Sequence, residues 1–218
     1  MHVKLISLSS MKGSLIGTSL PYDSPVSDKV LNNVWKAGHR SVVRHDIASF
    51  LVNGLSQSAL RQLSRHPHIN LTVKSSRYCD MSEQPIWMPS AVEREENMSS
   101  VEYEKDMKTI MEIYKKWKSY EGDKKEVDVA KQFLPLASTT DVVISGNIQA
   151  LYEFLQLRNC VRAEEEIRQM SLRMTAILKE KFKGINIFDN LGCAGDEWGL
   201  CPETHKPCGK YPVKGELL

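Results

Sequence analysis

A short segment, "SRHPHINLTVKSSRYC" (residues 64–79), concentrates cationic and titratable side chains, namely Arg65, His66, His68, Lys74 and Arg77. The hydroxyls of Ser75 and Ser76 directly precede the last arginine. Guanidinium groups bind two oxygens of a phosphate or carboxylate at once, and hydroxyls satisfy the remaining lone pairs. The segment therefore predicts an anion-binding site, and a solvated polar loop is the alternative that these residues alone leave open.

A second group of chemically active side chains lies in the tail "GCAGDEWGLCPETHKPCGKYP" (192–212), which contains Cys193, Cys201, His205 and Cys208. Three thiols and an imidazole could form a tetrahedral zinc site. No Cys-x-x-Cys pair is present, so ordinary reduced cysteines, ordered by packing of Trp198 and Tyr211, are an equal alternative. We commit to no metal and keep these four residues as a zinc candidate.

The whole chain limits the functions open to these groups. It has 218 residues and a net charge of +2. This charge is too small for general binding to nucleic acids or membrane surfaces, so anion binding must come from local clusters of cations. No apolar run reaches the roughly 18 residues that a membrane span needs. Five cysteines, an odd number, favour a reducing cytoplasm over a disulfide framework.

Alternating and β-rich segments predict the strands that must position these residues. We expect strands over 3–8, 47–54, 69–73 and 141–145. The segment 80–98 has two prolines and mixed charge, and is expected to be irregular.

Helical spacing and capping residues predict the helices. Ser56 and Asn147 are expected N-caps, and Ser99 with Glu102 fits a capping box. Strands come mostly early and helices mostly late, which favours an α+β fold with an antiparallel or mixed sheet packed with long helices. We expect helices over 27–38, 56–66, 99–120, 126–133, 147–158 and 161–182.

Five segments in the same order together resemble one known family. Arg65 and His66 open a series that continues, after Pro67 and seven further residues, with Ser75, Ser76 and Arg77. This series resembles the Arg-His-Arg, seven residues, Ser-x-Arg signature of flavin-dependent thymidylate synthases. The other segments similar to that family are "GHRSVVRHDIASF" (38–50), "AKQFLPL" (130–136), "NIQALYEFLQLR" (147–158) and "RAEEEIRQ" (162–169).

The resemblance implies an activity and a fold. The family makes dTMP from dUMP, taking a methylene group from methylenetetrahydrofolate and reducing it through FAD, which NADPH reduces. Its members are homotetramers with active sites shared between subunits. We therefore expect a catalytic domain over residues 1–190 with this family's fold, followed by a Cys-rich extension over 191–218, in a cytoplasmic enzyme.

The resemblance also implies roles for individual residues. The catalytic candidates are Arg158, which would contact the uracil ring, with Arg65 and Ser75. The pyrimidine nucleotide would be bound by Gln62, Arg65, Ser75, Ser76, Arg77, Lys131 and Arg158. The FAD would be bound by His39, Ser41, Arg65, His66, Pro67, Asn147, Gln149 and Glu153.

Several positions depart from the family pattern. Pro67 replaces the second arginine of the signature, Arg44 stands where an acidic residue is common, and Gln149 replaces an arginine expected at the FAD. Lys131 replaces a phosphate-binding arginine, keeping the charge without the bidentate geometry. These changes leave open a related flavin-dependent methyl- or hydroxymethyltransferase acting on another deoxypyrimidine monophosphate. A non-catalytic nucleotide or nucleic-acid binding module is the third interpretation, against which the modest net charge counts.

Overall fold

The computed structural model describes residues 1–94, 99–122 and 128–214. Contacts between residues divide the chain into two compact units. Unit 1 comprises residues 1–2, 52–65 and 72–142, and unit 2 comprises residues 3–51, 66–71 and 143–218. The boundaries fall within strands, so β2, β3 and β4 each contribute residues to both units.

Four strands form an antiparallel sheet in the order β1-β2-β4-β3. Their bounds are His2–Leu8 (β1), Ile47–Ser56 (β2), Asn70–Val73 (β3) and Thr139–Asn147 (β4). In β2 the side chains of Ala48, Phe50 and Val52 alternate into the core, which is the period-2 pattern of a strand with one buried face. All four expected strands are present, and the expected α+β class is confirmed.

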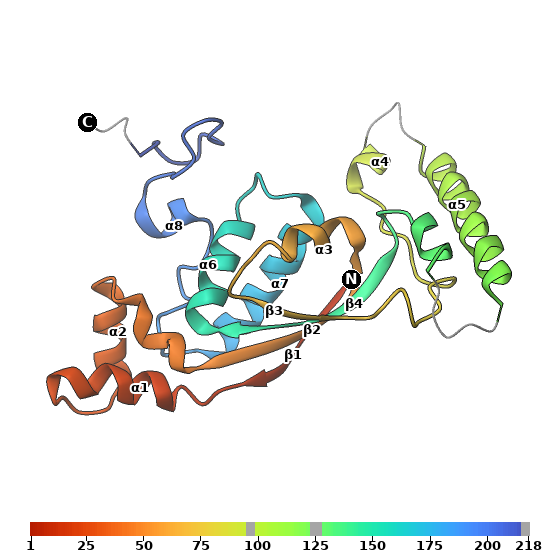
Figure 1. Ribbon diagram of the computed structural model, residues 1–218. Helices are drawn as coiled ribbons and strands as arrows, with labels where there is room; N and C mark the ends of the chain where they lie inside the picture. The colour runs from red at the N-terminus through yellow and green to blue at the C-terminus, as the bar shows by residue number, and fades with distance from the viewer. Residues whose placement is uncertain (95–98, 123–127, 215–218) are drawn as a thin grey trace. The chain divides into compact units, whose positions relative to one another are not determined.

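In unit 2, two helices lie against each other (Figure 1) and bury apolar side chains. α6 (Ile148–Arg158) buries Leu151 and Phe154, and α7 (Glu165–Lys181) buries Met170 and Met174. Each fully buried side chain of this kind contributes about 1.5–3 kcal/mol. Both helices were expected, over 147–158 and 161–182, and α7 starts later than expected.

Unit 2 also contains helices before β2. α2 (Asp28–Lys36) has Ser27 as its N-cap, which agrees with the expected helix start. The Ser27 hydroxyl accepts the N–H of Val30 at 3.4 Å. The pattern of the sequence did not predict α1 (Lys12–Ser19), the 3₁₀ helices η1 (Leu20–Tyr22) and η2 (Arg40–His45), or the short tail helix α8 (Ala194–Trp198).

The helix α1 depends on a tertiary contact with η2. A Cβ at Gly13 would lie 2.8 Å from Cβ of His45, so only glycine permits this approach. The buried Asp46 carboxylate accepts the N–H and the hydroxyl of Ser14 at 2.8 and 2.5 Å. Glycines lower helix propensity, so the sequence pattern alone does not favour a helix here.

Unit 1 contains α3 (Gln57–Leu63), α4 (Ser90–Arg94), α5 (Ser100–Glu121) and the 3₁₀ helix η3 (Ala130–Phe133). The hydroxyls of Ser56 and Ser99 cap α3 and α5, as expected. α5 packs beside η3 (Figure 1), and Met81, Met111, Tyr114 and Ala130 form the buried cluster there.

Three expectations in unit 1 need correction. The helix expected over 126–133 is only η3, and residues 126 and 127 lie outside the described part of the chain. The segment 80–98 is not wholly irregular, since it includes α4. Trp117, expected on the buried face of α5, is 36% exposed and stacks on Phe133 at 5.3 Å.

Candidate functional site

The serine–arginine segment forms a compact turn in unit 1. The N–H of Lys74 donates to the carbonyl of Asp141 at 2.9 Å, which ties the end of β3 to β4. The chain then turns, with the N–H of Cys79 donating to the carbonyl of Ser75 at 3.0 Å. The Ser75 hydroxyl accepts the N–H of Arg77 at 3.2 Å. The sheet and the turn thus fix the backbone that carries the predicted nucleotide residues.

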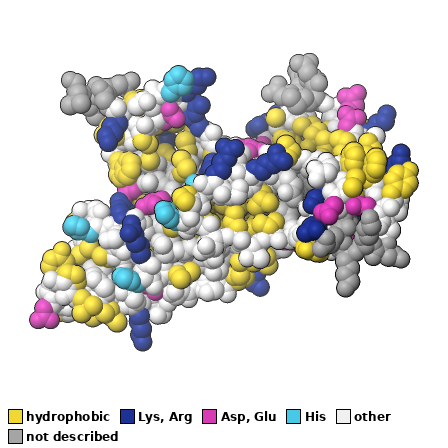
Figure 2. Space-filling view, in the orientation of Figure 1, with side chains coloured by type: hydrophobic (Ala, Val, Ile, Leu, Met, Phe, Trp, Pro, Cys, Tyr) yellow, Lys and Arg dark blue, Asp and Glu magenta, His cyan; other side chains and the backbone are white. Residues whose placement is uncertain are grey.

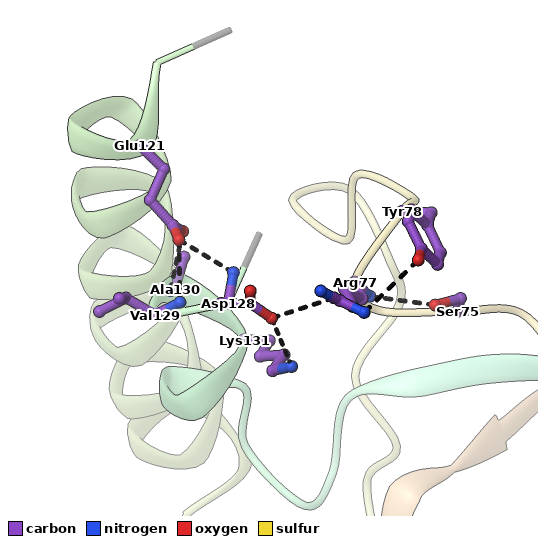
Figure 3. Close-up of polar contacts among 8 residues, drawn as sticks. All are labelled: Ser75, Arg77, Tyr78, Glu121, Asp128, Val129, Ala130 and Lys131. Atoms are coloured by element: carbon purple, nitrogen blue, oxygen red, sulfur yellow. Dashed lines mark hydrogen bonds and ion pairs between the residues drawn. The ribbon is translucent and has the colours of Figure 1, made fainter. Parts of the chain in front are cut away.

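Figure 3 shows that Arg77 and Lys131, predicted to bind a phosphate, converge on one carboxylate. Oδ1 of Asp128 accepts from Nε of Arg77 at 3.1 Å and from Nζ of Lys131 at 2.9 Å. The Lys131 hydrogen bond and the Arg77 charge hold the pKa of Asp128 below its usual value. Two cations that meet at one carboxylate oxygen are also placed to bind the oxygens of a phosphate. Asp128 is not among the residues predicted from the sequence.

Glu121, at the end of α5, anchors the segment that carries Lys131. Its carboxylate accepts the backbone N–H groups of Asp128 and Val129, each at 2.9 Å, and of Ala130 at 3.0 Å (Figure 3). These are the free N–H groups at the start of η3, which need an acceptor. Glu121 therefore positions Lys131, and the sequence pattern gave no signal for this role.

The remaining predicted nucleotide residues of unit 1 lie at the end of α3 and in the turn. Gln62 is half-buried on α3, and Arg65 is exposed just beyond the helix, where its N–H donates to the Gln62 carbonyl at 3.4 Å. Ser76 is half-buried in the turn. Unit 1 thus contains all the predicted nucleotide residues except Arg158.

A polar pocket of about 250 Å³ lies in unit 2. Nε of Arg44 donates to Oε1 of Gln149 at 2.6 Å, and Nε2 of Gln149 donates to Oε1 of Glu153 at 2.6 Å. Asn147 is the N-cap of α6, and its side chain accepts the N–H of Ala150 at 2.9 Å. The lining residues are Arg44, His68, Asn147, Gln149, Ala150 and Glu153.

The pocket unites three of the predicted FAD residues and adds two polar side chains that were missed. Asn147, Gln149 and Glu153 lie at i, i+2 and i+6, which one helix face cannot present together, and they meet because Asn147 is a cap and not a helical residue. Arg44 and His68 also line the pocket. Their only sequence signals were the departure at Arg44 and the place of His68 in the basic segment.

The other predicted FAD residues lie outside the pocket lining. His39 and Ser41 are exposed at the start of η2, and Pro67 is exposed in the turn after α3. His66 is half-buried and lies edge-on to Phe154 at 4.8 Å between ring centroids.

His66 contacts Arg158, the residue predicted to face the uracil ring. Nε of Arg158 donates to Nε2 of His66 at 3.1 Å. Burial, followed by the charge of Arg158, lowers the pKa of His66 below its ordinary value. His66 is therefore a neutral acceptor that orients the guanidinium of Arg158.

The structure does not gather the zinc candidates. Within residues 1–94, 99–122 and 128–214, no three His, Cys, Asp or Glu side chains come together as a metal site would require. Cys193 instead is the N-cap of α8, where its N–H donates to Oδ2 of Asp196 at 2.7 Å. Burial is the main cause that raises the pKa of its thiol. Among the described residues, no helix combines the length and hydrophobicity that crossing a membrane requires.

Comparison with known proteins identifies relatives over most of the chain. The chain is 29% identical over 192 residues to the flavin-dependent thymidylate synthase of Nitratidesulfovibrio vulgaris, covering 85% of this chain and 77% of that protein. It is 30% identical over 184 residues to the enzyme of the same name from Geobacter sulfurreducens, covering 83% and 75%.

A solved structure of thymidylate synthase X from Helicobacter pylori, with FAD and dUMP, has a similar fold. Its TM-score is 0.69 at 22% identity, covering 85% of this chain and 97% of that one. The family model described as thymidylate synthase complementing protein matches residues 9–182, a span that contains the serine–arginine turn, η3 and the polar pocket. The chain therefore belongs to the thymidylate synthase complementing protein family, and its curated relatives are flavin-dependent thymidylate synthases.

Proposed function

We propose that this protein is an FAD-dependent thymidylate synthase that reductively methylates dUMP to dTMP. The methylene group would come from methylenetetrahydrofolate, and NADPH would reduce the flavin. The observation that carries the proposal is the family match over residues 9–182, because every residue proposed here to bind the nucleotide or the flavin lies inside it. The curated relatives' name and the FAD and dUMP in the Helicobacter pylori structure support the choice of cofactor and substrate.

Binding of the nucleotide phosphate is assigned to unit 1. Arg77 and Lys131 supply the charge, and Ser75 and Ser76 supply hydroxyl and backbone donors at the turn. Asp128 holds the two cations together, so a phosphate must displace its carboxylate or share the cations with it. Gln62 and Arg65 complete the proposed set, and Ser75 acts as a hydrogen-bonding residue and not as a nucleophile.

Binding of the flavin is assigned to the polar pocket of unit 2. Arg44 provides a cation next to Gln149, where the family resemblance implies an arginine on the helix. The pocket's donors and acceptors suit a ribose or phosphate group. Its 250 Å³ is below the roughly 300–1,000 Å³ of sites for whole drug-sized ligands, so it would hold only part of the cofactor. His39, Ser41, His66 and Pro67 are proposed to contact the rest.

Arg158 is the proposed electrostatic catalyst. C5 of uracil must attack the electrophilic methylene carbon, and it does so more readily when negative charge develops on the ring and its oxygens. A guanidinium directed at the ring stabilises that charge as it develops. The neutral imidazole of His66 accepts a hydrogen bond from Arg158 and fixes its orientation. When bound, the flavin supplies the hydride that reduces the transferred group, while the protein positions the reactants.

The assembly and location follow from the same proposal. A homotetramer with shared sites is proposed, and exposed hydrophobic side chains on α5 support an interface there. Figure 2 shows these hydrophobic side chains among charged ones over α5, and Val101, Ile113 and Tyr120 are among the exposed residues. The catalytic domain over 1–190, the extension over 191–218 and the cytoplasmic location stay predictions.

The decisive experiment is an absorbance spectrum of protein purified without added cofactor. We expect a flavin spectrum that NADPH bleaches, and dTMP formation when dUMP and methylenetetrahydrofolate are added. A flavin that NADPH cannot reduce, or a colourless protein that FAD does not reconstitute, would contradict the proposal.

The acceptor is tested by thermal protection, because a ligand that binds the folded state raises its melting temperature by mass action. We expect dUMP to protect more than other deoxypyrimidine monophosphates. Stronger protection by another one would support the related methyl- or hydroxymethyltransferase instead.

A further inference from the structure

The tail of the chain, beyond the family match, contacts a residue of the proposed flavin-binding segment. Glu197, on α8, forms an ion pair with Nη2 of Arg40, the first residue of η2. Arg40 stands between His39 and Ser41, to which the proposed function assigns flavin contacts. The two partners belong to unit 2, and α8 lies outside the matched residues 9–182.

Glu197 is itself held by α6. Its Oε2 accepts the hydroxyl of Tyr152 at 2.8 Å and Nε2 of Gln156 at 2.5 Å. The carboxylate thus connects the tail, α6 and η2 through three side chains. With 15% side-chain exposure, it has little access to water, so these partners replace most of its hydration.

Arg40 depends on this carboxylate. Its guanidinium lies over the rings of Trp35 at 4.0 Å and Tyr152 at 5.2 Å. Its Nη1 is buried, with no hydrogen-bond partner among the described residues. Removing one partner of such a pair leaves a charge that is poorly solvated, which is more costly than losing an exposed ion pair.

The tail presents Glu197 from an ordered element. The adjacent Asp196 accepts the Cys193 N–H, Nζ of Lys210 at 2.5 Å and the hydroxyl of Tyr211 at 2.6 Å. Burial opposes ionisation of Asp196, but these hydrogen bonds outweigh it and keep its pKa well below the usual range. Backbone bonds between Cys201 and Pro212 and between Lys214 and Cys201 close the tail on itself.

We propose that Glu197 is a positioning residue for the flavin, and that the C-terminal tail acts through Arg40 to hold η2 in its binding geometry. η2 carries Arg44, which lines the polar pocket and bonds Gln149 at 2.6 Å. α1 packs against His45, the last residue of η2. The first residue, Arg40, is instead held by its ion pair with Glu197. This inference rests on the assignment of FAD to unit 2.

The test compares FAD affinity of the wild type with that of Glu197→Gln, which keeps the shape of the side chain and removes its charge. Each protein is titrated with FAD by flavin fluorescence, at a temperature where circular dichroism shows it folded. We expect the Kd for FAD to rise about tenfold, the lower end of the roughly 10–100-fold loss seen when a residue that supports a metal ligand is removed. The visible band of the bound flavin should also shift.

Two further variants make the result specific. Glu203→Gln, in the same tail, removes the same charge at an exposed residue whose carboxylate accepts the backbone N–H groups of His205 and Lys206. This variant should bind FAD like the wild type. Tyr152→Phe removes one hydrogen-bond donor to Glu197 and should raise the Kd for FAD, but by less than Glu197→Gln does. This variant keeps the proposal testable if Glu197→Gln does not fold.

The outcomes separate this inference from the proposed function. If the wild type fails to bind FAD, the proposed function is wrong. If the wild type binds FAD and folded Glu197→Gln binds it equally well with an unchanged flavin band, only the role of the tail is wrong. Equal weakening by Glu203→Gln would also overturn the role of Glu197, because it would reflect a general charge effect.

Discussion

At the scale of single residues, the structure gives four of the proposed binding cations a side-chain partner. Arg77 and Lys131 share Asp128, Arg44 bonds Gln149, and Arg158 bonds His66. A partner that also accepts or donates hydrogen bonds restricts the rotamers of a long side chain, which otherwise loses much entropy on binding a ligand. The predictions at this scale therefore concern the partners as much as the cations.

Substitution of Asp128 by Asn should strengthen binding of dUMP. The carboxylate competes with the phosphate for Arg77 and Lys131, and the amide lacks its charge. We expect the Kd for dUMP, measured by calorimetry, to fall about threefold, a modest change because the groups are partly exposed. Asp106→Asn on α5 is the matched control. Weaker binding by the Asp128 variant would show that this carboxylate positions the cations and does not compete.

The His66–Arg158 contact predicts an abnormal titration. The pKa of His66, measured by NMR, should lie below its ordinary value of 6.5. In Arg158→Gln it should rise, because the cation is gone, while burial still keeps it low. The pKa of His66 is lower in the folded state than in the unfolded chain. The stability contributed by neutral His66 is therefore fully present above pH 6.5 and is lost as the pH falls below 6.5 toward the folded-state pKa. A His66 pKa that Arg158→Gln leaves unchanged would refute the contact.

At the scale of elements, short structures are held by contacts with distant parts of the chain. η3 is anchored by Glu121 of α5, η2 by α1 and the tail, and the 80–82 segment by α5. Helices of this length are marginal in isolation. Their stability therefore depends on the anchoring side chains.

Gly13→Ala should destabilise the protein. The new methyl group would approach Cβ of His45 at 2.8 Å and its carbonyl oxygen at 3.3 Å, forcing α1 away from η2. We expect a loss of about 1–3 kcal/mol, as for overpacked sites, in denaturant unfolding. Lys12→Ala, one exposed helical position earlier, is the control and should be nearly neutral. A stabilised Gly13→Ala would mean that helix propensity outweighs this contact.

The bond between Asp80 and Lys118 predicts a pH-dependent contribution to stability. Burial acts to raise the pKa of Asp80, but hydrogen bonds from Lys118 and Ser82 outweigh it and lower the pKa to about 2. The contribution is therefore present above the unfolded value of 3.8 and lost as the pH falls toward about 2. The stability difference between wild type and Asp80→Asn should shrink over this range. A difference that stays constant would exclude the ionised bond, and Glu104→Gln is the control.

At the scale of the whole molecule, a chain of net charge +2 obtains its anion binding from local clusters and not from an overall field. The two units carry different parts of the proposed chemistry. The predicted nucleotide residues, apart from Arg158, belong to unit 1, and the polar pocket belongs to unit 2.

This charge distribution predicts how the protein responds to salt. Binding of dUMP should weaken only gradually as salt is added, because few counterions are released. A single-stranded oligonucleotide should bind weakly at physiological ionic strength, and calorimetric titrations of both ligands at several salt concentrations would measure this. Tight oligonucleotide binding with a steep salt dependence would instead favour the nucleic-acid binding module.

The sequence by itself determined the features that depend on neighbouring residues. Serine and asparagine side chains cap helices within three or four residues, so Ser27, Ser56 and Asn147 were correctly placed at helix starts. Alternating or β-rich segments predicted all four strands. The ordered segments also identified the family. These signals are local in the chain or reside in residue identity, and neither requires knowledge of distant contacts.

Only the tertiary structure decided which distant residues became partners. Arg44 and Gln149 are separated by 105 positions, yet they form the centre of the polar pocket. Asp128 and Arg77 meet across 51 positions, and Glu197 reaches Arg40 from the tail. α1 exists because its glycines fit His45, against their own propensity. No local pattern encodes such pairs, because they form only once packing of the sheet and helices has fixed where each side chain lies.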